Sequence, residues 1–359
     1  MKISKKVRGW CILALAAVFV FPCLNFIRTQ AAGGIDIGKD DCSLTVSVEI
    51  GQTDEGNKEY LEDSNEMTIP VSVYRVADVD VTGQRYNPTE PFKNMDFSDL
   101  SPEHNGDTAD RWRKLAQEAE KIRVGAEDPL EAAGTVDVKK QEGSTEAAQG
   151  VIGGLTPGLY LVVPEASYNP DYTVLYTFIP YLTALPASEY TLTGEGSDEW
   201  VYDMKIGLKP EAEPQFGKLH IVKGLQNYNE TLGQTTFVFH IVGVDKLGVT
   251  KYDEVASMTY TAAGSNTVTL EGIPAGLNVT VTEVYSGASY TIVGPDESTA
   301  LIWSDAAISN GVPGAGEATV TFTNRYDGGN RGGYGVTNHF ESDGDGGWIW
   351  ENPTTPLEE

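Results

Sequence analysis

The chain of 359 residues carries 25 lysines and arginines against 52 aspartates and glutamates, which gives a net charge of −27 at pH 7. An acidic surface of this kind repels nucleic-acid phosphates and anionic lipid head groups, so it excludes both as partners. The length suffices for two domains of roughly 100–200 residues each.

The first 31 residues have the pattern of a secretory signal. Four basic residues precede an apolar run over 10–24, and small residues follow at 29–32. A charged start, an apolar segment and a small-residue cleavage site are typical of exported proteins. We therefore predict that residues 1–31 are a signal peptide, that the protein is secreted, and that the mature chain has no membrane span.

The cysteine count agrees with a chain that has no internal disulfide. Cys11 and Cys23 fall in the predicted signal peptide and leave Cys42 alone. One cysteine cannot form a disulfide within a mature exported chain. We expect any covalent cross-link in this protein to be of another kind.

Residues 40–209 are predicted to form a first, β-rich domain with one inserted helix. Alternating apolar and polar residues predict a strand over 44–50. Asp107 and Thr108 are helix-start residues, and an apolar stripe that continues to about Arg123 predicts a packed helix. Further strands are predicted over 67–81, 154–163, 172–182 and 199–208. The segment PEAEP (210–214) is predicted to be a stiff polar linker.

Residues 215–341 are predicted to form a second domain. Short apolar segments separated by Gly, Asn, Asp and Pro predict an antiparallel β-sandwich. These segments are KLHIVK, TFVFHIVGV, VASMTYTAA, TVTLEGI, LNVTVTEVY, YTIVG and ATVTFTNRY. The predicted fold class is therefore all-β, with two Ig-like antiparallel β-sandwich domains in tandem, the first with an inserted helix. Residues 342–359 are predicted to be a flexible tail.

Three strands of the second domain each place one polar residue on an apolar face. Alternate residues of a strand share a face. By this rule Lys223 is in phase with Leu219 and Ile221. Glu283 is in phase with Leu277, Val279 and Val281, and Asn324 with Val320 and Phe322. The second domain is thus predicted to carry a lysine, a glutamate and an asparagine on its core faces.

These residue types allow two interpretations. Burial lowers the pKa of a lysine and raises that of a glutamate, so a neutral Lys223 amine could attack the Asn324 carboxamide while Glu283 moves protons. The product would be an amide cross-link between the first and last strands. The simpler interpretation from alternation alone is a structural ion pair between Lys223 and Glu283, with Asn324 capping a turn.

A family resemblance favours the cross-link. The segments GKLHIVKGL, VTVTEVYSGASY and ATVTFTNRY, in that order, resemble the Gram-positive pilin isopeptide-linkage domain and its collagen-adhesin B-type relatives, over about 215–341. The resemblance implies a bond between Lys223 and Asn324, with Glu283 as the internal catalyst. Asn338 in VTNHF is in phase with Val336 and Phe340, so it is the rival acyl donor.

Residues 42–209 resemble the N-terminal domain of backbone pilins, through SLTVSVEI, VYRVADVD, LTPGLYLVVPE and WVYDMKIGLKP. The resemblance implies that a sortase could join Lys209 to another pilin subunit. The family has an aromatic residue and a proline just before this lysine, whereas Gly207 and Leu208 precede it here. A solvated linker lysine is the alternative interpretation of Lys209. The rule that alternate strand residues share a face predicts no internal cross-link of this kind in the first domain.

The expected function follows from these features. We expect a structural, pilin-like protein of a Gram-positive cell surface or cell wall, with other pilin subunits as partners. The alternatives are an adhesin or stalk protein that binds host matrix, and a secreted enzyme with Glu283 in a cleft. The family's wall-anchoring signal is not found before Glu359, so truncation, another means of retention and free secretion all remain open.

No cofactor, metal site or enzymatic turnover is expected. The four histidines, His104, His220, His240 and His339, lack metal-ligand spacing. The sequence contains no nucleophile elbow, zinc-protease motif or phosphate-binding loop.

Overall fold

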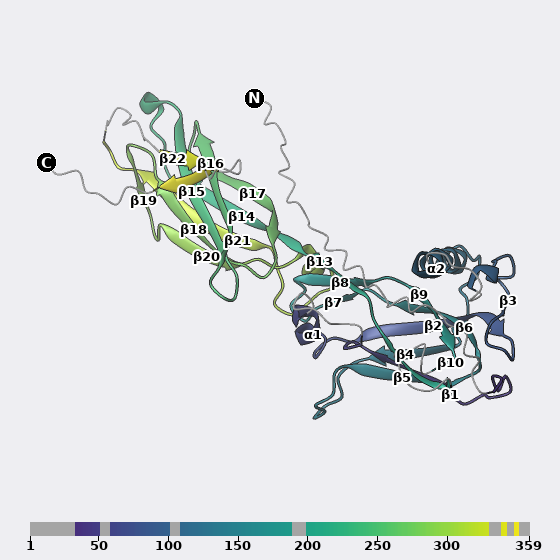
Figure 1. Cartoon of the computed structure of the whole chain (residues 1–359). Coiled ribbons are helices and arrows are strands. Elements are labelled where there is room, and N and C mark those ends of the chain that lie inside the picture. Colours follow the sequence, from purple (N-terminus) through teal and green to yellow (C-terminus); the bar gives the residue numbers. More distant parts are fainter. Residues whose placement is uncertain are drawn as a thin grey trace. The chain divides into compact units, whose positions relative to one another are not determined.

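The computed structural model describes residues 33–50, 58–100, 108–188, 199–329, 339–342 and 348–351 (Figure 1). Contacts divide the chain into two compact units, Met1–Glu213 and Pro214–Glu359. The predicted signal peptide, residue Asn338 and most of the predicted tail lie outside the described residues. Among the helices of the described ranges, none has the length and apolar character needed to cross a membrane.

The first unit is β-rich, and one long helix covers part of it (Figure 1). Its elements, in chain order, are β1 (Cys42–Ser47), α1 (Lys58–Asp63), β2 (Ile69–Val79), β3 (Tyr86–Pro88), η2 (Ser98–Leu100), α2 (Thr108–Val124), β4 (Gly134–Val138), β5 (Gln149–Leu155), β6 (Gly158–Pro164), β7 (Ser167–Tyr168), β8 (Val174–Phe178), β9 (Tyr181–Leu185), β10 (Ala187–Ser188), β11 (Trp200–Val201), β12 (Asp203–Gly207) and β13 (Pro210–Pro214).

Two sheets enclose the main core of this unit. One has the order β12-β1-β5, and the other has the order β3-β2-β6-β9 with β4 also paired to β2. Leu44 and Val46 of β1 pack in the same cluster as Val73 and Val162 of the second sheet. Helix α2 packs Ala116 and Ala119 in a separate cluster with residues of β6. Strand β6 is therefore covered on both faces, which explains its unbroken apolar sequence.

The second unit is a sandwich of two four-stranded sheets. Its elements are β14 (Phe216–Leu225), η3 (Glu230–Leu232), β15 (Thr235–Val244), β16 (Thr250–Tyr260), β17 (Gly264–Pro274), β18 (Asn278–Tyr285), β19 (Tyr290–Ile292), β20 (Glu297–Leu301), α4 (Asp305–Ser309), β21 (Ala318–Tyr326), β22 (His339–Ser342) and β23 (Trp348–Glu351). The sheet orders are β17-β14-β21-β19 and β16-β15-β18-β20, with β22 and β23 paired separately.

Inward-facing residues of both sheets form one core in this unit. Ile221 and Phe322 come from one sheet, Phe239 and Val281 from the other, and all four are at most 1% exposed. Such interdigitation of two inner faces is the packing of a β-sandwich. The predicted all-β fold with a helix inserted in the first unit is confirmed.

Several details differ from the sequence predictions, and one is that the strand predicted over 199–208 is two strands, β11 and β12, in different sheets. The strand predicted over 154–163 is two strands, β5 and β6, because Thr156 and Pro157 interrupt it. Pro180 likewise separates β8 from β9, since proline has no N–H to donate to a ladder. The segment 210–214 is an edge strand paired with β8 rather than an unpaired linker. The first and last strands of the sandwich, β14 and β21, pair in parallel, although the sandwich was predicted to be antiparallel.

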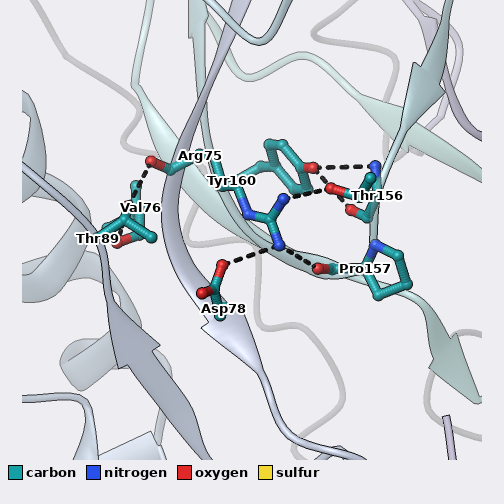
Figure 2. Close-up of polar contacts among 7 residues, drawn as sticks. All are labelled: Arg75, Val76, Asp78, Thr89, Thr156, Pro157 and Tyr160. Carbon is teal, nitrogen blue, oxygen red and sulfur yellow. Dashed lines mark hydrogen bonds and ion pairs between the residues drawn. The ribbon is translucent and has the colours of Figure 1, made fainter. Parts of the chain in front are cut away.

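An arginine holds the link between β5 and β6, where the chain passes from one sheet to the other. Arg75 lies on β2, and its guanidinium donates to the Thr156 hydroxyl and, at 2.8 Å, to the Pro157 carbonyl (Figure 2). It also pairs with Asp78 at 2.9 Å, and the Tyr160 hydroxyl donates to the Thr156 carbonyl at 2.7 Å. These contacts fix both residues of the link.

Replacing Arg75 with methionine is expected to loosen this link. Hydrogen bonds from a charged donor contribute about 1.5–3 kcal/mol, and the 34% exposure of this side chain reduces that to about 1–2 kcal/mol. Amide hydrogen exchange of the full chain, measured on peptides covering 149–164, is expected to become roughly tenfold faster. Arg85 is exposed, so Arg85→Met is the matched control. We expect it to leave the amide exchange of peptides 149–164 unchanged. Equal exchange in both variants would contradict the role of Arg75.

Candidate functional site

The candidate site lies inside the sandwich of the second unit, near the ends of three strands. Lys223, Glu283 and Asn324 each come two residues before the end of β14, β18 and β21, respectively. The alternating burial of these strands turns all three side chains inward. The phase relation noted in the sequence therefore corresponds to inward-facing side chains in the structure.

The pairing of strands determines which side chains meet. In the parallel pair of β14 and β21, Lys223 lies opposite Phe322, and Leu225 lies opposite Asn324. Lys223 and Asn324 are therefore diagonal neighbours on one sheet. Glu283 belongs to β18 of the other sheet, so it reaches the pair across the core.

A single carboxylate contacts both nitrogen atoms. The Lys223 Nζ donates to Glu283 Oε2 at 2.6 Å, and the Asn324 Nδ2 donates to Glu283 Oε1 at 2.6 Å. A weaker contact of 3.3 Å joins Asn324 Nδ2 to the Ser286 carbonyl. The amine and the amide nitrogen are thereby held beside each other by the two oxygens of Glu283.

All three residues are removed from solvent. Lys223 and Asn324 are fully buried, and Glu283 is 5% exposed. The Lys223 Nζ lies 4.7 Å from the ring centre of Phe237 and 5.7 Å from that of Phe239. The Asn324 Oδ1 is buried and has no hydrogen-bond partner among the described residues. The Lys223 amine thus lies beside two aromatic rings in the interior of the sandwich.

Burial favours the neutral forms of the pair. Desolvation lowers the pKa of Lys223, although the hydrogen bond and charge of Glu283 act against this shift. Desolvation raises the pKa of Glu283, although Lys223 and Asn324 act in the opposite direction. Both shifts favour transfer of a proton from the lysine to the glutamate, which would leave a free amine next to a carboxamide.

Lys209 belongs to the first unit. Its ammonium is 4.8 Å from the ring centre of Tyr181, and burial lowers the pKa of the amine. Its carbonyl accepts from Ile179 N at 3.3 Å. Lys209 is therefore half-buried against an aromatic ring, and it differs from the solvated linker lysine that the sequence offered as an alternative.

The alternation test did not single out the aromatic residues of the site. Phe237 and Phe239 were predicted only as part of a strand, and Tyr260 was predicted the same way. The Tyr260 hydroxyl donates to the Lys223 carbonyl. The same alternation in TFVFHIV and VASMTY places these rings on a core face, so that signal was present in the sequence.

The second unit matches a known protein family. A family model described as a domain of unknown function (DUF5979) matches residues 219–327, a span that contains Lys223, Glu283 and Asn324. No curated protein matches this chain.

The solved structures similar to this chain include Gram-positive pilins. A streptococcal ancillary pilin is 14% identical with a TM-score of 0.25, over 80% of this chain and 69% of that chain. The major pilin SpaD from Corynebacterium diphtheriae is 13% identical with a TM-score of 0.24, over 82% and 99%. The basal pilin SpaE from Lactobacillus rhamnosus GG is 14% identical with a TM-score of 0.30, over 79% and 99%. Similarity at this level assigns no activity or partner to the present chain.

Proposed function

We propose that this chain is an exported, pilin-like structural protein of the cell surface, whose second unit is cross-linked by an amide bond between Lys223 and Asn324. The observation that carries the proposal is the buried Glu283 carboxylate, whose two oxygens contact the Lys223 amine and the Asn324 amide nitrogen at 2.6 Å each. A structural ion pair needs only the first of these contacts. The second contact places the amide nitrogen of Asn324, which is the leaving group of the proposed reaction, at the same carboxylate.

The proposed reaction balances without any cofactor. Lys223 gives a proton to Glu283, and its neutral amine attacks Cγ of Asn324. Glu283 protonates Nδ2 and accepts a proton from the attacking nitrogen, so that the bond from Cγ to Nδ2 breaks as the new amide bond forms. Ammonia leaves with the proton that Glu283 gave to Nδ2 and takes up the second proton from Glu283 as ammonium, which restores the carboxylate. The reaction occurs once per chain, so we do not class the protein as an enzyme.

The site is poorly suited to turnover of an external substrate. Glu283 is 5% exposed, and both its oxygens are occupied by side chains of the same unit. A hydrolytic carboxylate must reach substrate in an open cleft. These contacts favour the cross-link over the alternative of a secreted enzyme.

A cross-link at this place suits a protein that bears force. Lys223 and Asn324 lie on the first and last strands of the sandwich, which pair directly in parallel. A covalent bond there would carry tension past the roughly 100 residues between the two strands, which would then not unfold. This mechanical role agrees with the sequence resemblance to pilin subunits.

Tryptic digestion tests which residues are joined. Cleavage at unmodified lysines and arginines would leave Lys223 within the peptide 219–246, and Asn324 within 252–325. We expect one branched peptide that contains both ranges and lacks one ammonia. A branch to the peptide 332–359 would identify Asn338 as the acyl donor instead. Two separate peptides, with cleavage after Lys223, would contradict the proposed bond.

Assembly with other pilin subunits through a sortase remains the second part of the proposal. Lys209 is the candidate acceptor, and its lowered pKa makes the amine a better nucleophile at neutral pH. On denaturing gels, a sortase-dependent ladder that Lys209→Ala abolishes and that the exposed-lysine variant Lys205→Ala retains would support it. A ladder that survives Lys209→Ala would exclude Lys209. A monomer that binds host matrix would favour the adhesin alternative.

A further inference from the structure

We propose that Tyr260 is a positioning residue for the cross-link, one that holds Lys223 at the correct distance from Glu283. This inference rests on the proposed function, and it concerns a residue outside the set of lysine, glutamate and asparagine. Tyr260 is the last residue of β16 and is 2% exposed.

The hydroxyl of Tyr260 enters the backbone ladder of the opposite sheet. Lys223 of β14 and Asn266 of β17 are register partners in that sheet. The Tyr260 hydroxyl donates to the Lys223 carbonyl and accepts from the Asn266 N–H at 3.1 Å. The Tyr260 hydroxyl therefore joins the carbonyl of one residue to the N–H of its register partner. Tyr260 itself lies on β16, which belongs to the other sheet.

The ring of Tyr260 reaches the same lysine by a second route. It packs edge-to-face on Phe237, with the ring centres 5.5 Å apart and the planes at 83°. Phe237 in turn lies 4.7 Å from the Lys223 Nζ. One residue thus fixes the main chain of Lys223 directly and supports the ring beside its amine.

This arrangement bears on the reaction because the reacting groups come from different sheets. Lys223 and Asn324 lie on one sheet, and Glu283 lies on the other. The 2.6 Å contact from Lys223 Nζ to Glu283 Oε2 therefore depends on the local spacing between the sheets. A hydroxyl from the Glu283 sheet, bonded to the Lys223 carbonyl, sets that spacing at the residue that reacts.

Among the described residues, the titratable groups that face Lys223 across the core are Glu283 from β18 and Tyr260 from β16. Burial raises the pKa of Tyr260, so its hydroxyl keeps the proton that it donates to the Lys223 carbonyl. Without that hydroxyl, the Lys223 carbonyl and the Asn266 N–H lose a shared partner, and the main chain at the end of β14 loses this hydrogen bond to the opposite sheet.

The test is the rate of cross-linking in folded, full-length chain. The chain is made by cell-free synthesis, translation is stopped, and samples are taken over time. Intact mass gives the fraction that has lost ammonia, and protease resistance gives the folded fraction. Tyr260→Phe is compared with wild type and with Tyr290→Phe. Tyr290 also packs on Phe237, at 5.8 Å, but its hydroxyl accepts from Asn229 N.

We expect Tyr260→Phe to cross-link roughly 10- to 100-fold more slowly per folded chain, because misplacement by about 1 Å can cost about 10²-fold in rate. Its pH–rate profile should move to higher pH. A Lys223 amine less well held in the core has a higher pKa, so a higher pH is needed to free it. Tyr290→Phe should match wild type in both measurements.

The outcomes separate this inference from the proposed function. If wild type and Tyr260→Phe cross-link at the same rate per folded chain, with the same pH profile, then Tyr260 only supports the fold and the inference is wrong. If wild type itself keeps its full mass while folded, the proposed function fails, and the role of Tyr260 fails with it.

Discussion

Replacement of Lys223 with methionine is expected to lower the melting temperature of the second unit by about 8–20 °C. Under the chain-entropy model, a cross-link that closes a loop of about 100 residues contributes about 4–5 kcal/mol, and each kcal/mol changes the melting temperature by about 2–4 °C in a domain of this size. Methionine keeps most of the apolar volume of the lysine, so packing changes little. Differential scanning calorimetry of the full chain measures the effect.

The control for this variant is Lys218→Met on the same strand. Lys218 has a partly exposed side chain that pairs with Asp305 at 3.5 Å, and surface pairs of this kind contribute about 0–1 kcal/mol. We therefore expect its melting temperature to stay close to that of wild type. Equal melting temperatures for wild type and Lys223→Met would show that no covalent bond at Lys223 stabilises the unit.

Replacement of Glu283 with glutamine is expected to stop cross-linking without unfolding the unit. Glutamine has nearly the same shape, and its Oε1 can still accept from Lys223 or from Asn324, but its amide cannot accept and return a proton at neutral pH. General acid–base groups contribute roughly 10²–10⁴-fold to a rate. We therefore expect Glu283→Gln to lose ammonia slower than wild type by roughly the same factor. Time-resolved intact mass after synthesis is the measurement.

Glu271→Gln is the matched control, since Glu271 is an exposed glutamate on β17 of the same unit. It should cross-link at the wild-type rate. If Glu283→Gln were to lose ammonia as fast as wild type, Glu283 would have only a structural part in the site, and the proton transfers assigned to it would be wrong.

The inward-facing residues of the second unit could be predicted because a strand has a period of two. Leu219, Ile221 and Lys223 share a face in any straight strand, and the structure turns that face into the core. Alternation alone could not show that β14 and β21 pair directly, or that β18 lies opposite them. Those relations depend on contacts between residues far apart in the chain, and ordered motifs of a family resemblance were needed to anticipate them.

Sequence patterns were less successful where tertiary contacts decide the structure. The apolar run over 154–163 looked continuous, but Arg75, about 80 residues away, stabilises a break at Thr156 and Pro157. PEAEP has the composition of a linker, yet it becomes an edge strand because β8 offers a partner. Alternation could place Tyr260 on a core face, but its contact with the Lys223 carbonyl joins two sheets, so its role in the site could not be predicted from the local sequence.

Intact mass spectrometry of the folded, full-length chain tests the central claim most directly. The proposed bond between Lys223 and Asn324 predicts a mass lower by one ammonia than the sequence of the same chain requires. The Asn324→Ala variant should show no such deficit, because it has no carboxamide to give up. A folded wild-type chain with its full sequence mass would contradict the cross-link, and the three buried residues would then be a structural ion pair with a hydrogen-bonded asparagine.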